Sequence, residues 1–312
     1  MKIAFYGPDP IRMQEWIANL KQEGLEFDVA QGSEQGSAAP AEARYAVVWL
    51  PDAAFFKRET SLEVVFNVGA GVDGILKLKS IPEHVDIVRL DDSEIGQKMS
   101  EYVLHAVAEI TRHLGGYRDA AKANNWKPGP YTYFDDWPIG VMGLGTVGRQ
   151  IAGFLSMLGY PVNGWSRSPR HVAGVNGFNG AGQMGAFLAA SRIVINVLPL
   201  TPETENILNR HTFDQMRDGS FIINIGRGEH LNESDLLDSL NSGKLAGAVL
   251  DVFREEPLPA MHPFWTDTRI RITPHISGAT NLKLAMRQIA GKIKAHQAGE
   301  PITGIVDKKM GY

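Results

Sequence analysis

The sequence predicts an α/β fold made of two domains, each with a parallel sheet. Short apolar runs alternate with longer amphipathic stretches along the chain, which is typical of βαβ units. The length of 312 residues fits roughly two domains of about 100–200 residues each. A turn-rich stretch over 115–138 separates two series of strands, so we expect the chain to be organised in two parts.

The first series contains three predicted strands and two long helices. Apolar residues recur at helical spacing over 11–23 and over 94–113, so we expect a helix in each segment. Residues 31–44 are rich in Gly, Ser, Ala and Glu, which indicates a surface loop or a weak helix. Strands are expected at 2–6, 46–50 and 64–68, each ending in a Gly, Pro or Asp turn.

The second series begins with the apolar run at 139–142 and ends in a helix predicted over 281–297. A domain boundary is therefore expected near 90–95. Three of the six tryptophans, Trp49, Trp126 and Trp137, are interpreted as packing residues. Further strands are expected at 162–165, 193–198, 221–225, 246–250 and 270–273.

Composition excludes several classes of function. The net charge of −4 gives no overall attraction to nucleic acid. The chain has no cysteine, hence no thiolate nucleophile, and its nine histidines show no metal-binding spacing, so no metal is expected. No apolar stretch approaches about 18 residues, and the start lacks the apolar core of a signal peptide. We therefore expect a cytoplasmic protein that contacts no membrane.

A glycine-rich turn follows the strand predicted at 139–142. Gly143, Gly145 and Gly148 form a G-x-G-x-x-G pattern between this strand and a helix running to about residue 158. In this pattern the first glycine allows a tight turn, the second lets the backbone approach a pyrophosphate, and the third allows close helix–strand packing. The helix N-terminus adds N–H groups and a positive dipole end. The context favours a Rossmann-like, doubly wound domain that binds a dinucleotide.

The turn after the next strand indicates which dinucleotide is bound. An NAD-binding domain carries Asp or Glu there to bind the ribose hydroxyls. This chain has Ser166, Arg167 and Ser168 instead, followed by Arg170. Since arginine binds a phosphate through its planar fork and a carboxylate repels one, NADP is favoured. The alternative to a phosphate-binding role is that this is an ordinary basic turn exposed to solvent.

Three polar residues follow successive predicted strands. Arg227 follows the strand at 221–225, Glu256 lies in the loop after 246–250, and His275 follows 270–273. Each could be an ordinary surface or loop residue. However, the carboxyl ends of parallel strands are where open α/β sheets bind ligands. Together the three side chains offer an anion-binding group and a His–carboxylate pair, which suits the reduction of a carbonyl group.

These segments resemble the D-isomer-specific 2-hydroxyacid dehydrogenase family, and more narrowly its short glyoxylate/hydroxypyruvate reductase branch. The resemblance spans about residues 65–280, in the order expected for the family. Its motifs are Gly69-Ala-Gly-Val-Asp73, Gly143-Leu144-Gly145-Thr146-Val147-Gly148, Leu198-Pro199-Leu-Thr-Pro-Glu-Thr204, Ile223-Asn-Ile-Gly-Arg-Gly, Asp251-Val-Phe-x-x-Glu-Pro-Leu and Thr273-Pro-His-Ile-Ser-Gly. The Ser166-Arg167 pair resembles the turn with which this branch reads NADPH.

The resemblance implies a set of roles. Arg227 would bind the carboxylate of a small 2-oxo acid, His275 would protonate its carbonyl oxygen as hydride arrives, and Glu256 would orient His275. The amides of Ala70 and Gly71 would bind the same carboxylate from the other domain. Asp251 would face the nicotinamide amide. The remaining cofactor-binding residues would be Gly143, Leu144, Gly145, Thr146, Val147, Gly148, Ser166, Arg167, Ser168, Leu198, Pro199 and Thr204.

The resemblance also implies an architecture. Residues 1–92 with 285–312 would form the substrate-binding domain, residues 93–284 the NADP-binding domain, and a cleft would lie between them. The protein would be a homodimer and would use NADPH in preference to NADH. Two other interpretations stay open: a reductase or dehydrogenase acting on another 2-oxo acid, and a non-enzymatic dinucleotide-sensing protein built on the same fold.

Overall fold

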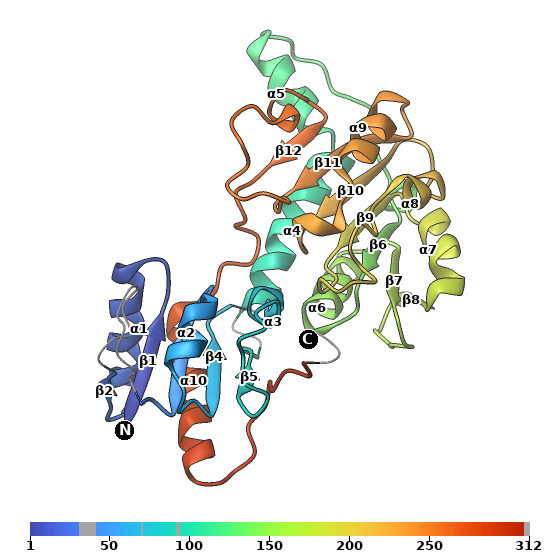
Figure 1. The fold of residues 1–312 in the computed structure, drawn as a ribbon. Coiled ribbons are helices and arrows are strands. Elements are labelled where there is room, and N and C mark those ends of the chain that lie inside the picture. Colours follow the sequence, from blue (N-terminus) through green and yellow to red (C-terminus); the bar gives the residue numbers. More distant parts are fainter. Residues whose placement is uncertain (31–41, 70, 92–93, 309–312) are drawn as a thin grey trace. The chain divides into compact units, whose positions relative to one another are not determined.

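Two separate parallel sheets organise the chain, as the ribbon in Figure 1 shows. The computed structural model describes residues 1–30, 42–69, 71–91 and 94–308. It divides into one unit of Met1–Ile95 with Thr280–Tyr312 and a second unit of Gly96–Ala279. The expected α/β class with two doubly wound parallel sheets is confirmed. Most of the loop or weak helix expected over 31–44 lies outside the described residues.

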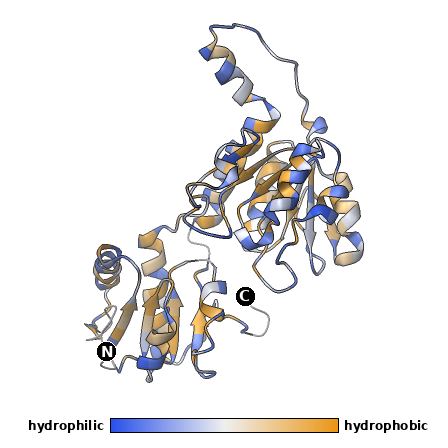
Figure 2. Ribbon diagram, turned by 45° about the horizontal axis from the view of Figure 1, so that its top comes forward, coloured by the Kyte–Doolittle hydropathy of each residue, from blue (hydrophilic) through white to orange (hydrophobic). Residues whose placement is uncertain are grey.

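The first unit is built around a five-stranded sheet in the order β2-β1-β3-β4-β5, and every neighbouring pair is parallel. Its central strands are buried along their length, and Figure 2 shows hydrophobic residues concentrated on them. The strands are β1 (Lys2–Tyr6), β2 (Asp28–Val29), β3 (Tyr45–Val48), β4 (Val64–Asn67) and β5 (Asp86–Val88). The helices are α1 (Pro10–Gln22), α2 (Ala53–Arg58), α3 (Asp73–Leu76) and α10 (Leu282–Gln297).

Helix α10, from the end of the chain, belongs to this first unit. Its residues Ala285, Met286, Ile289 and Ile293 are fully buried in the same hydrophobic cluster as strand residues of β1, β3 and β4. The helix begins at a sequence-encoded cap, because the Asn281 side chain accepts a hydrogen bond from the Leu284 N–H. The apolar face of α10 therefore completes a core that the first 95 residues begin.

The second unit contains a seven-stranded parallel sheet in the order β12-β11-β10-β9-β6-β7-β8. The strand order reverses at β6, which pairs with both β7 and β9. Its strands are β6 (Ile139–Met142), β7 (Val162–Ser166), β8 (Val175–Asn179), β9 (Ile193–Asn196), β10 (Ser220–Asn224), β11 (Leu245–Leu250) and β12 (Ile270–Ile272). Its helices are α4 (Ile95–Thr111), α5 (Leu114–Lys122), α6 (Thr146–Met157), α7 (Met184–Ala190), α8 (Arg210–Asp214) and α9 (Glu233–Asn241). The first residue of α4, Ile95, is the last residue of the N-terminal segment of the first unit.

Two expectations for the segment between the strand series are wrong. The stretch over 115–138 is not all turns, because α5 occupies its first part. None of the nine residues of α5 is buried, although Leu114, Tyr117 and Ala121 recur at helical spacing, so the sequence did carry a short apolar pattern here. Trp126 was expected to pack, but it is 99% exposed, whereas Trp137 is buried and Trp49 packs partly buried against the core of the first unit. Both views show α5 and the following segment extending away from the sheet of their own unit (Figures 1 and 2).

The strands predicted from apolar runs are otherwise confirmed, within a few residues at their ends. In the part of the chain that the structure describes, no helix is both long enough and apolar enough to span a bilayer.

Candidate active site

The glycine-rich turn connects β6 to α6. Gly143 has a φ of +110°, a conformation that side chains other than glycine rarely adopt. A Cβ on Gly148 would lie 1.7 Å from the Gly143 carbonyl oxygen, so only glycine allows α6 to approach the loop this closely. A Cβ on Gly145 would meet no described atom within 4 Å, so this position faces open space at the start of α6. The turn therefore fits the backbone approach of a pyrophosphate.

The loop after β9 lies beside this turn. Because β6 and β9 are paired at the point where the strand order reverses, their carboxyl ends form the crevice in which such sheets bind ligands. A Cβ on Gly143 would approach Leu198 Cδ2 to 3.2 Å, which shows how closely the two loops pack. Thr204 Oγ1 donates to the Pro199 carbonyl at 2.8 Å and accepts from the Thr201 N–H at 2.8 Å. The loop is thus held in shape by its own hydroxyl groups.

The basic turn after β7 lies near the same loop. Ser166 Oγ donates to the Ser168 carbonyl at 2.8 Å, while the Arg167 side chain is exposed. A hydrogen bond with Thr201 lowers the pKa of Glu203, and the positive charge of Arg167 acts in the same direction. The turns after β7 and β9 therefore lie close enough for their charges to interact. Whether Arg167 reads a 2′-phosphate stays a prediction.

His275 and Glu256 form a hydrogen-bonded ion pair. His275 Nδ1 lies 2.8 Å from Glu256 Oε2, and Glu256 Oε1 accepts from the Phe253 N–H at 2.9 Å. The hydrogen bond to Glu256 raises the pKa of His275, against opposing effects of burial and of the Arg227 charge. Burial opposes the charged form of Glu256, but the hydrogen bonds from His275 and Phe253 and the nearby positive charges together lower its pKa. The pair therefore favours a protonated imidazole beside a carboxylate.

Arg227 lies in the turn after β10, and its charge influences both members of this pair. Its guanidinium Nη1 donates to the Gly226 carbonyl at 2.7 Å. The Asn224 side chain donates to the Arg227 carbonyl at 2.9 Å, which fixes the backbone of the turn. A Cβ on Gly228 would lie 1.9 Å from the Phe253 carbonyl carbon, so this turn packs directly against the loop after β11.

The loop carrying His275 is anchored by Asp251, which is fully buried at the end of β11. The Asp251 carboxylate accepts from Thr273 Oγ1 at 2.6 Å and from the N–H groups of Ile276 and Ser277, each at 2.9 Å. The Asp251 carbonyl accepts from the His275 N–H at 2.8 Å. His275 has a φ of +53°, a conformation that costs of order 1 kcal/mol for a residue with a side chain, and these contacts hold it there.

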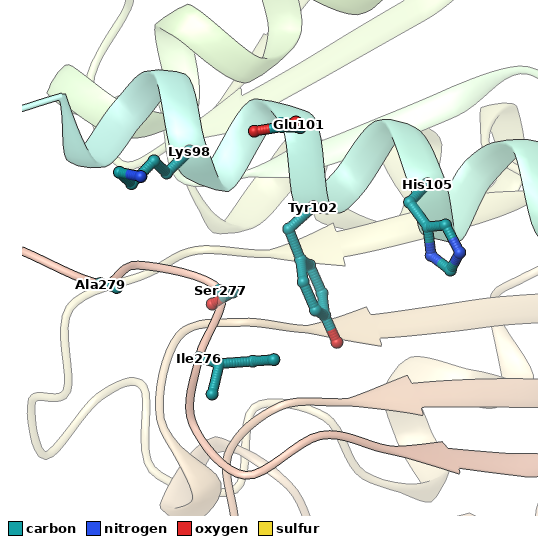
Figure 3. Close-up of a pocket in the computed structure, with 7 residues that line it drawn as sticks. All are labelled: Lys98, Glu101, Tyr102, His105, Ile276, Ser277 and Ala279. Atoms are coloured by element: carbon teal, nitrogen blue, oxygen red, sulfur yellow. The ribbon is translucent and has the colours of Figure 1, made fainter.

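Tyr102 braces this loop from α4, as Figure 3 shows. Its hydroxyl lies 2.6 Å from Thr273 Oγ1. The single hydroxyl proton of Thr273 is directed to Asp251, so Tyr102 must be the donor. Burial raises the pKa of Tyr102 to about 12, which keeps the phenol protonated for that role. A cavity of about 270 Å³ lies beside it, lined by Lys98, Glu101, Tyr102, His105, Ile276, Ser277 and Ala279.

The structure thus brings Arg227, Glu256 and His275 together at the carboxyl ends of β10, β11 and β12, as the sequence predicted for their positions. Their roles in catalysis stay predictions. Ala70 lies outside the described residues, and Gly71 belongs to the first unit, where its carbonyl accepts from Asn67 Nδ2 at 2.8 Å. Across the residues described, no group of three or more His, Cys, Asp or Glu is placed to hold a metal ion.

Three residues of the site were missed by sequence reasoning. Asn196 and Asn224 end two buried strands, and His230 lies shortly after Arg227; all three are fully buried. Asn196 Nδ2 donates to Asn224 Oδ1 at 2.9 Å and lies 2.8 Å from His230 Nδ1. The sequence did carry a signal for the two asparagines, because each is a polar residue that directly follows an apolar run: Ile-Val-Ile-Asn for Asn196 and Phe-Ile-Ile-Asn for Asn224. No local pattern in the sequence indicated the contact between Asn196 and His230.

This combination of fold and site defines a class of protein. The sequence profile of the D-isomer specific 2-hydroxyacid dehydrogenase family, NAD binding domain, matches residues 104–277. The chain belongs to this family. Over the full length of both chains it is 41% identical to glyoxylate/hydroxypyruvate reductase A of Serratia proteamaculans and 38% identical to the protein of the same name from Yersinia enterocolitica.

Solved structures agree with this assignment. A D-isomer specific 2-hydroxyacid dehydrogenase of Xanthobacter autotrophicus, in complex with NADPH and MES, has a TM-score of 0.92 at 35% identity. An NADPH-dependent glyoxylate/hydroxypyruvate reductase of Sinorhizobium meliloti, in complex with NADP and sulfate, has a TM-score of 0.91 at 33% identity. Both alignments cover 100% of this chain and 99% of the other.

The ion pair generates a prediction that needs no assay of activity. Glu256→Gln removes the negative charge that favours protonated His275 while keeping a similar shape, so the pKa of His275 should fall. NMR titration of the His275 ring measures this. Glu255→Gln removes the same charge one residue away and serves as the control. A His275 pKa that is equal in the two variants contradicts the pairing.

Proposed function

We propose that this protein is a cytoplasmic, NADPH-dependent reductase of small 2-oxo acids, which converts glyoxylate to glycolate and hydroxypyruvate to glycerate. The observation that carries the proposal is the hydrogen-bonded His275–Glu256 pair beside Arg227, at the carboxyl ends of three neighbouring strands. Relatives over the whole chain are named glyoxylate/hydroxypyruvate reductase A, which supports this choice of substrate. In the same proposal, residues 1–92 with 285–312 bind substrate and residues 93–284 bind the cofactor.

His275 acts as the general acid. Its Nδ1 is bonded to Glu256, so the proton that leaves is the one on Nε2. NADPH, when bound, supplies the hydride that reaches C2 of the substrate. His275 gives its Nε2 proton to the carbonyl oxygen, and the resulting neutral imidazole keeps its proton on Nδ1, where it is hydrogen-bonded to Glu256. The raised pKa of His275 favours the charged form of this acid, and the hydrogen bond to Glu256 orients the ring.

Arg227 binds the substrate carboxylate through its planar guanidinium. The Asn224–Arg227 backbone contact and the close packing of Gly228 hold the turn in place. The amides of Ala70 and Gly71 are proposed as further ligands of the carboxylate. Glyoxylate and hydroxypyruvate are small, so this carboxylate supplies much of their binding energy. A substrate without it would lose this interaction and should bind poorly.

The residues of the second unit fit NADP. The open space at Gly145 and the uncapped start of α6 suit the pyrophosphate, and Leu144, Thr146 and Val147 lie in the same turn. Leu198, Pro199 and Thr204 form the opposite wall of the crevice. Ser166, Arg167 and Ser168 are proposed to bind the 2′-phosphate, since the turn after β7 carries an arginine and hydroxyl groups where NAD-binding domains carry a carboxylate. NADP in structures of similar chains supports this choice.

A panel of substrates tests the proposed reaction. With NADPH, glyoxylate and hydroxypyruvate should have the highest kcat/KM, and acetaldehyde should be very poor because it lacks a carboxylate. Arg227→Lys keeps the charge but loses the planar fork, so it should lose a large part of kcat/KM for both acids. His275→Ala should lower kcat roughly 10²–10⁴-fold while NADPH still binds.

Three outcomes of this panel contradict parts of the proposal. If acetaldehyde rivals glyoxylate, Arg227 does not select for a carboxylate. If phenylpyruvate is the best substrate, the mechanism stands and the substrate class is wrong. If NADPH binds but no 2-oxo acid is reduced, the protein is a dinucleotide-binding protein and not this enzyme.

Cofactor preference is tested at Arg167. We expect kcat/KM with NADPH to exceed that with NADH by at least about tenfold, which is about 1.4 kcal/mol. Arg167→Ala should weaken NADPH binding and leave NADH binding nearly unchanged, because only NADPH carries the 2′-phosphate. Fluorescence titration gives both Kd values, with Arg170→Ala as a nearby change of the same charge. Equal losses for the two cofactors would show that Arg167 does not read the phosphate.

The homodimer is also part of the proposal. Trp126, Tyr131, Tyr133 and Phe134 are large and exposed in the segment that extends from the second unit. Burying each of these rings would stabilise an assembly by about 1.5–3 kcal/mol. A second copy of the chain is the partner we propose for this surface.

Sedimentation equilibrium tests this assembly. The wild-type protein should be a dimer, and Trp126→Ser combined with Tyr131→Ser should weaken it. Met261→Ser, which removes another exposed apolar side chain of the second unit, should leave the dimer intact. A monomeric wild-type protein at micromolar concentration contradicts the dimer, and an unchanged dimer in the double variant contradicts this choice of surface.

A further inference from the structure

A buried histidine contacts both of the loops to which we assign substrate and cofactor binding. His230 ends the short 3₁₀ turn Gly228–His230 after β10 and is fully buried. Its Nδ1 lies 3.1 Å from the Arg227 backbone nitrogen, and its Nε2 lies 3.3 Å from the Pro199 carbonyl oxygen. One imidazole ring therefore spans the turn of Arg227 and the loop that carries Leu198 and Thr204.

The contacts determine which nitrogen of His230 carries the proton. A backbone N–H can only donate, so Nδ1 must accept from Arg227 and carries no proton. A carbonyl oxygen can only accept, so Nε2 must carry the proton and donate it to Pro199. The structure thus requires the neutral Nε2–H tautomer.

The neighbouring amides support the same assignment. Asn196 Oδ1 accepts from the Leu198 N–H at 3.3 Å, which leaves its Nδ2 as the atom 2.8 Å from His230 Nδ1. Asn224 Oδ1 accepts from the Gly226 N–H at 3.2 Å, and its Nδ2 donates to the Arg227 carbonyl. Both amide orientations are therefore fixed by backbone donors. His230 Nδ1 therefore receives two hydrogen bonds, one from Asn196 Nδ2 and one from the Arg227 N–H.

The turn of Arg227 lies directly against this ring. A Cβ on Gly226 would lie 3.0 Å from both His230 Nδ1 and Asn196 Nδ2, so little space separates the backbone from the imidazole. Pro199, at the other end of the ring, also accepts from Thr204 Oγ1. A shift of the ring would therefore be transmitted to both loops.

We propose that His230 is a positioning residue with two separable effects. Through Nδ1 it sets the backbone at Arg227, and through Nε2–H it sets the loop of Pro199. This inference rests on the proposed function for the identity of the two ligands, a 2-oxo acid at Arg227 and NADPH at the Pro199 loop. The tautomer and the contacts themselves do not depend on it.

Two isosteric substitutions separate the effects. In His230→Asn the amide oxygen can replace Nδ1 as an acceptor, but nothing reaches Pro199. In His230→Gln the amide nitrogen can replace Nε2 as a donor, but the acceptor for Arg227 is lost. His230→Leu removes both and is the reference for complete loss.

The expected pattern is a crossover between the two variants. His230→Asn should raise the Kd of NADPH roughly 3–10-fold, the usual effect of one hydrogen bond, and leave the KM of glyoxylate near the wild-type value. His230→Gln should raise the KM of glyoxylate, measured at saturating NADPH, and leave the Kd of NADPH near the wild-type value. His230→Leu should raise both. Thermal unfolding identifies the variants that remain folded.

The tautomer is measured independently in the wild-type protein. With selective ¹⁵N-histidine labelling, the NMR signals of His230 should show an unprotonated Nδ1 and a protonated Nε2. These signals are assigned by their disappearance in His230→Asn or His230→Gln. A protonated Nδ1 overturns the inference, whether or not any variant folds. Equal effects of the Asn and Gln variants on both ligands overturn it as well, because they would indicate a general packing role.

Failure of the proposed function is distinguishable from failure of this inference. If the wild-type protein reduces no 2-oxo acid, the proposed function fails. The tautomer of His230 in the wild-type protein and the Kd of NADPH for His230→Asn still test the positioning role of His230. If the wild-type protein is active and the crossover is missing, the assignment of His230 fails alone.

Discussion

The buried carboxylate of Asp251 is the interaction on which the geometry of the site depends. It lies at the end of β11 with no exposure to solvent and accepts hydrogen bonds from the hydroxyl of Thr273 and the N–H groups of Ile276 and Ser277. A buried carboxylate is stable in a protein interior only when its oxygen atoms accept hydrogen bonds. Here the donors come from the loop of His275, so satisfying the carboxylate also shapes that loop and holds His275 at its positive φ.

The same principle recurs along the sheet. Asn196 at the end of β9 and Asn224 at the end of β10 are buried amides that hydrogen-bond to the loops that follow them, whereas Asp251 at the end of β11 bonds to the loop after the neighbouring strand β12. Apolar residues along the strands are buried in the core. One polar residue at the carboxyl end of each strand forms hydrogen bonds that hold the backbone of an adjoining loop. Because neighbouring parallel strands end at one edge, these polar ends act on adjoining loops.

Glycine supports this arrangement where side chains would prevent close approach. Gly148 lets α6 lie against the Gly143 carbonyl, and Gly228 lets the turn of Arg227 lie against Phe253. A side chain at either position would separate elements that carry the candidate cofactor and substrate residues. The close packing at these glycines and the hydrogen bonds of the buried polar residues both hold the loops in place. Each therefore restricts the movement of the side chains that the loops carry.

The sequence by itself determined the α/β class, most of the strands and the positions of Arg227, Glu256 and His275 at strand ends. Apolar runs bounded by turns are local signals, and a strand end is visible in them. It did not reveal α5, whose short apolar pattern lies in a stretch rich in Gly, Asn and Pro, or the exposure of Trp126, because an apolar residue in a sequence does not show whether tertiary packing covers it.

Only the tertiary structure decided which distant residues meet. The burial of α10 in the core of the first unit joins segments some 280 positions apart, and the contact of His230 with Pro199 joins two loops. The bonding of Tyr102 to Thr273 links a helix to a loop 171 residues further along the chain. Such contacts depend on strand order and loop packing, which no single stretch of sequence encodes.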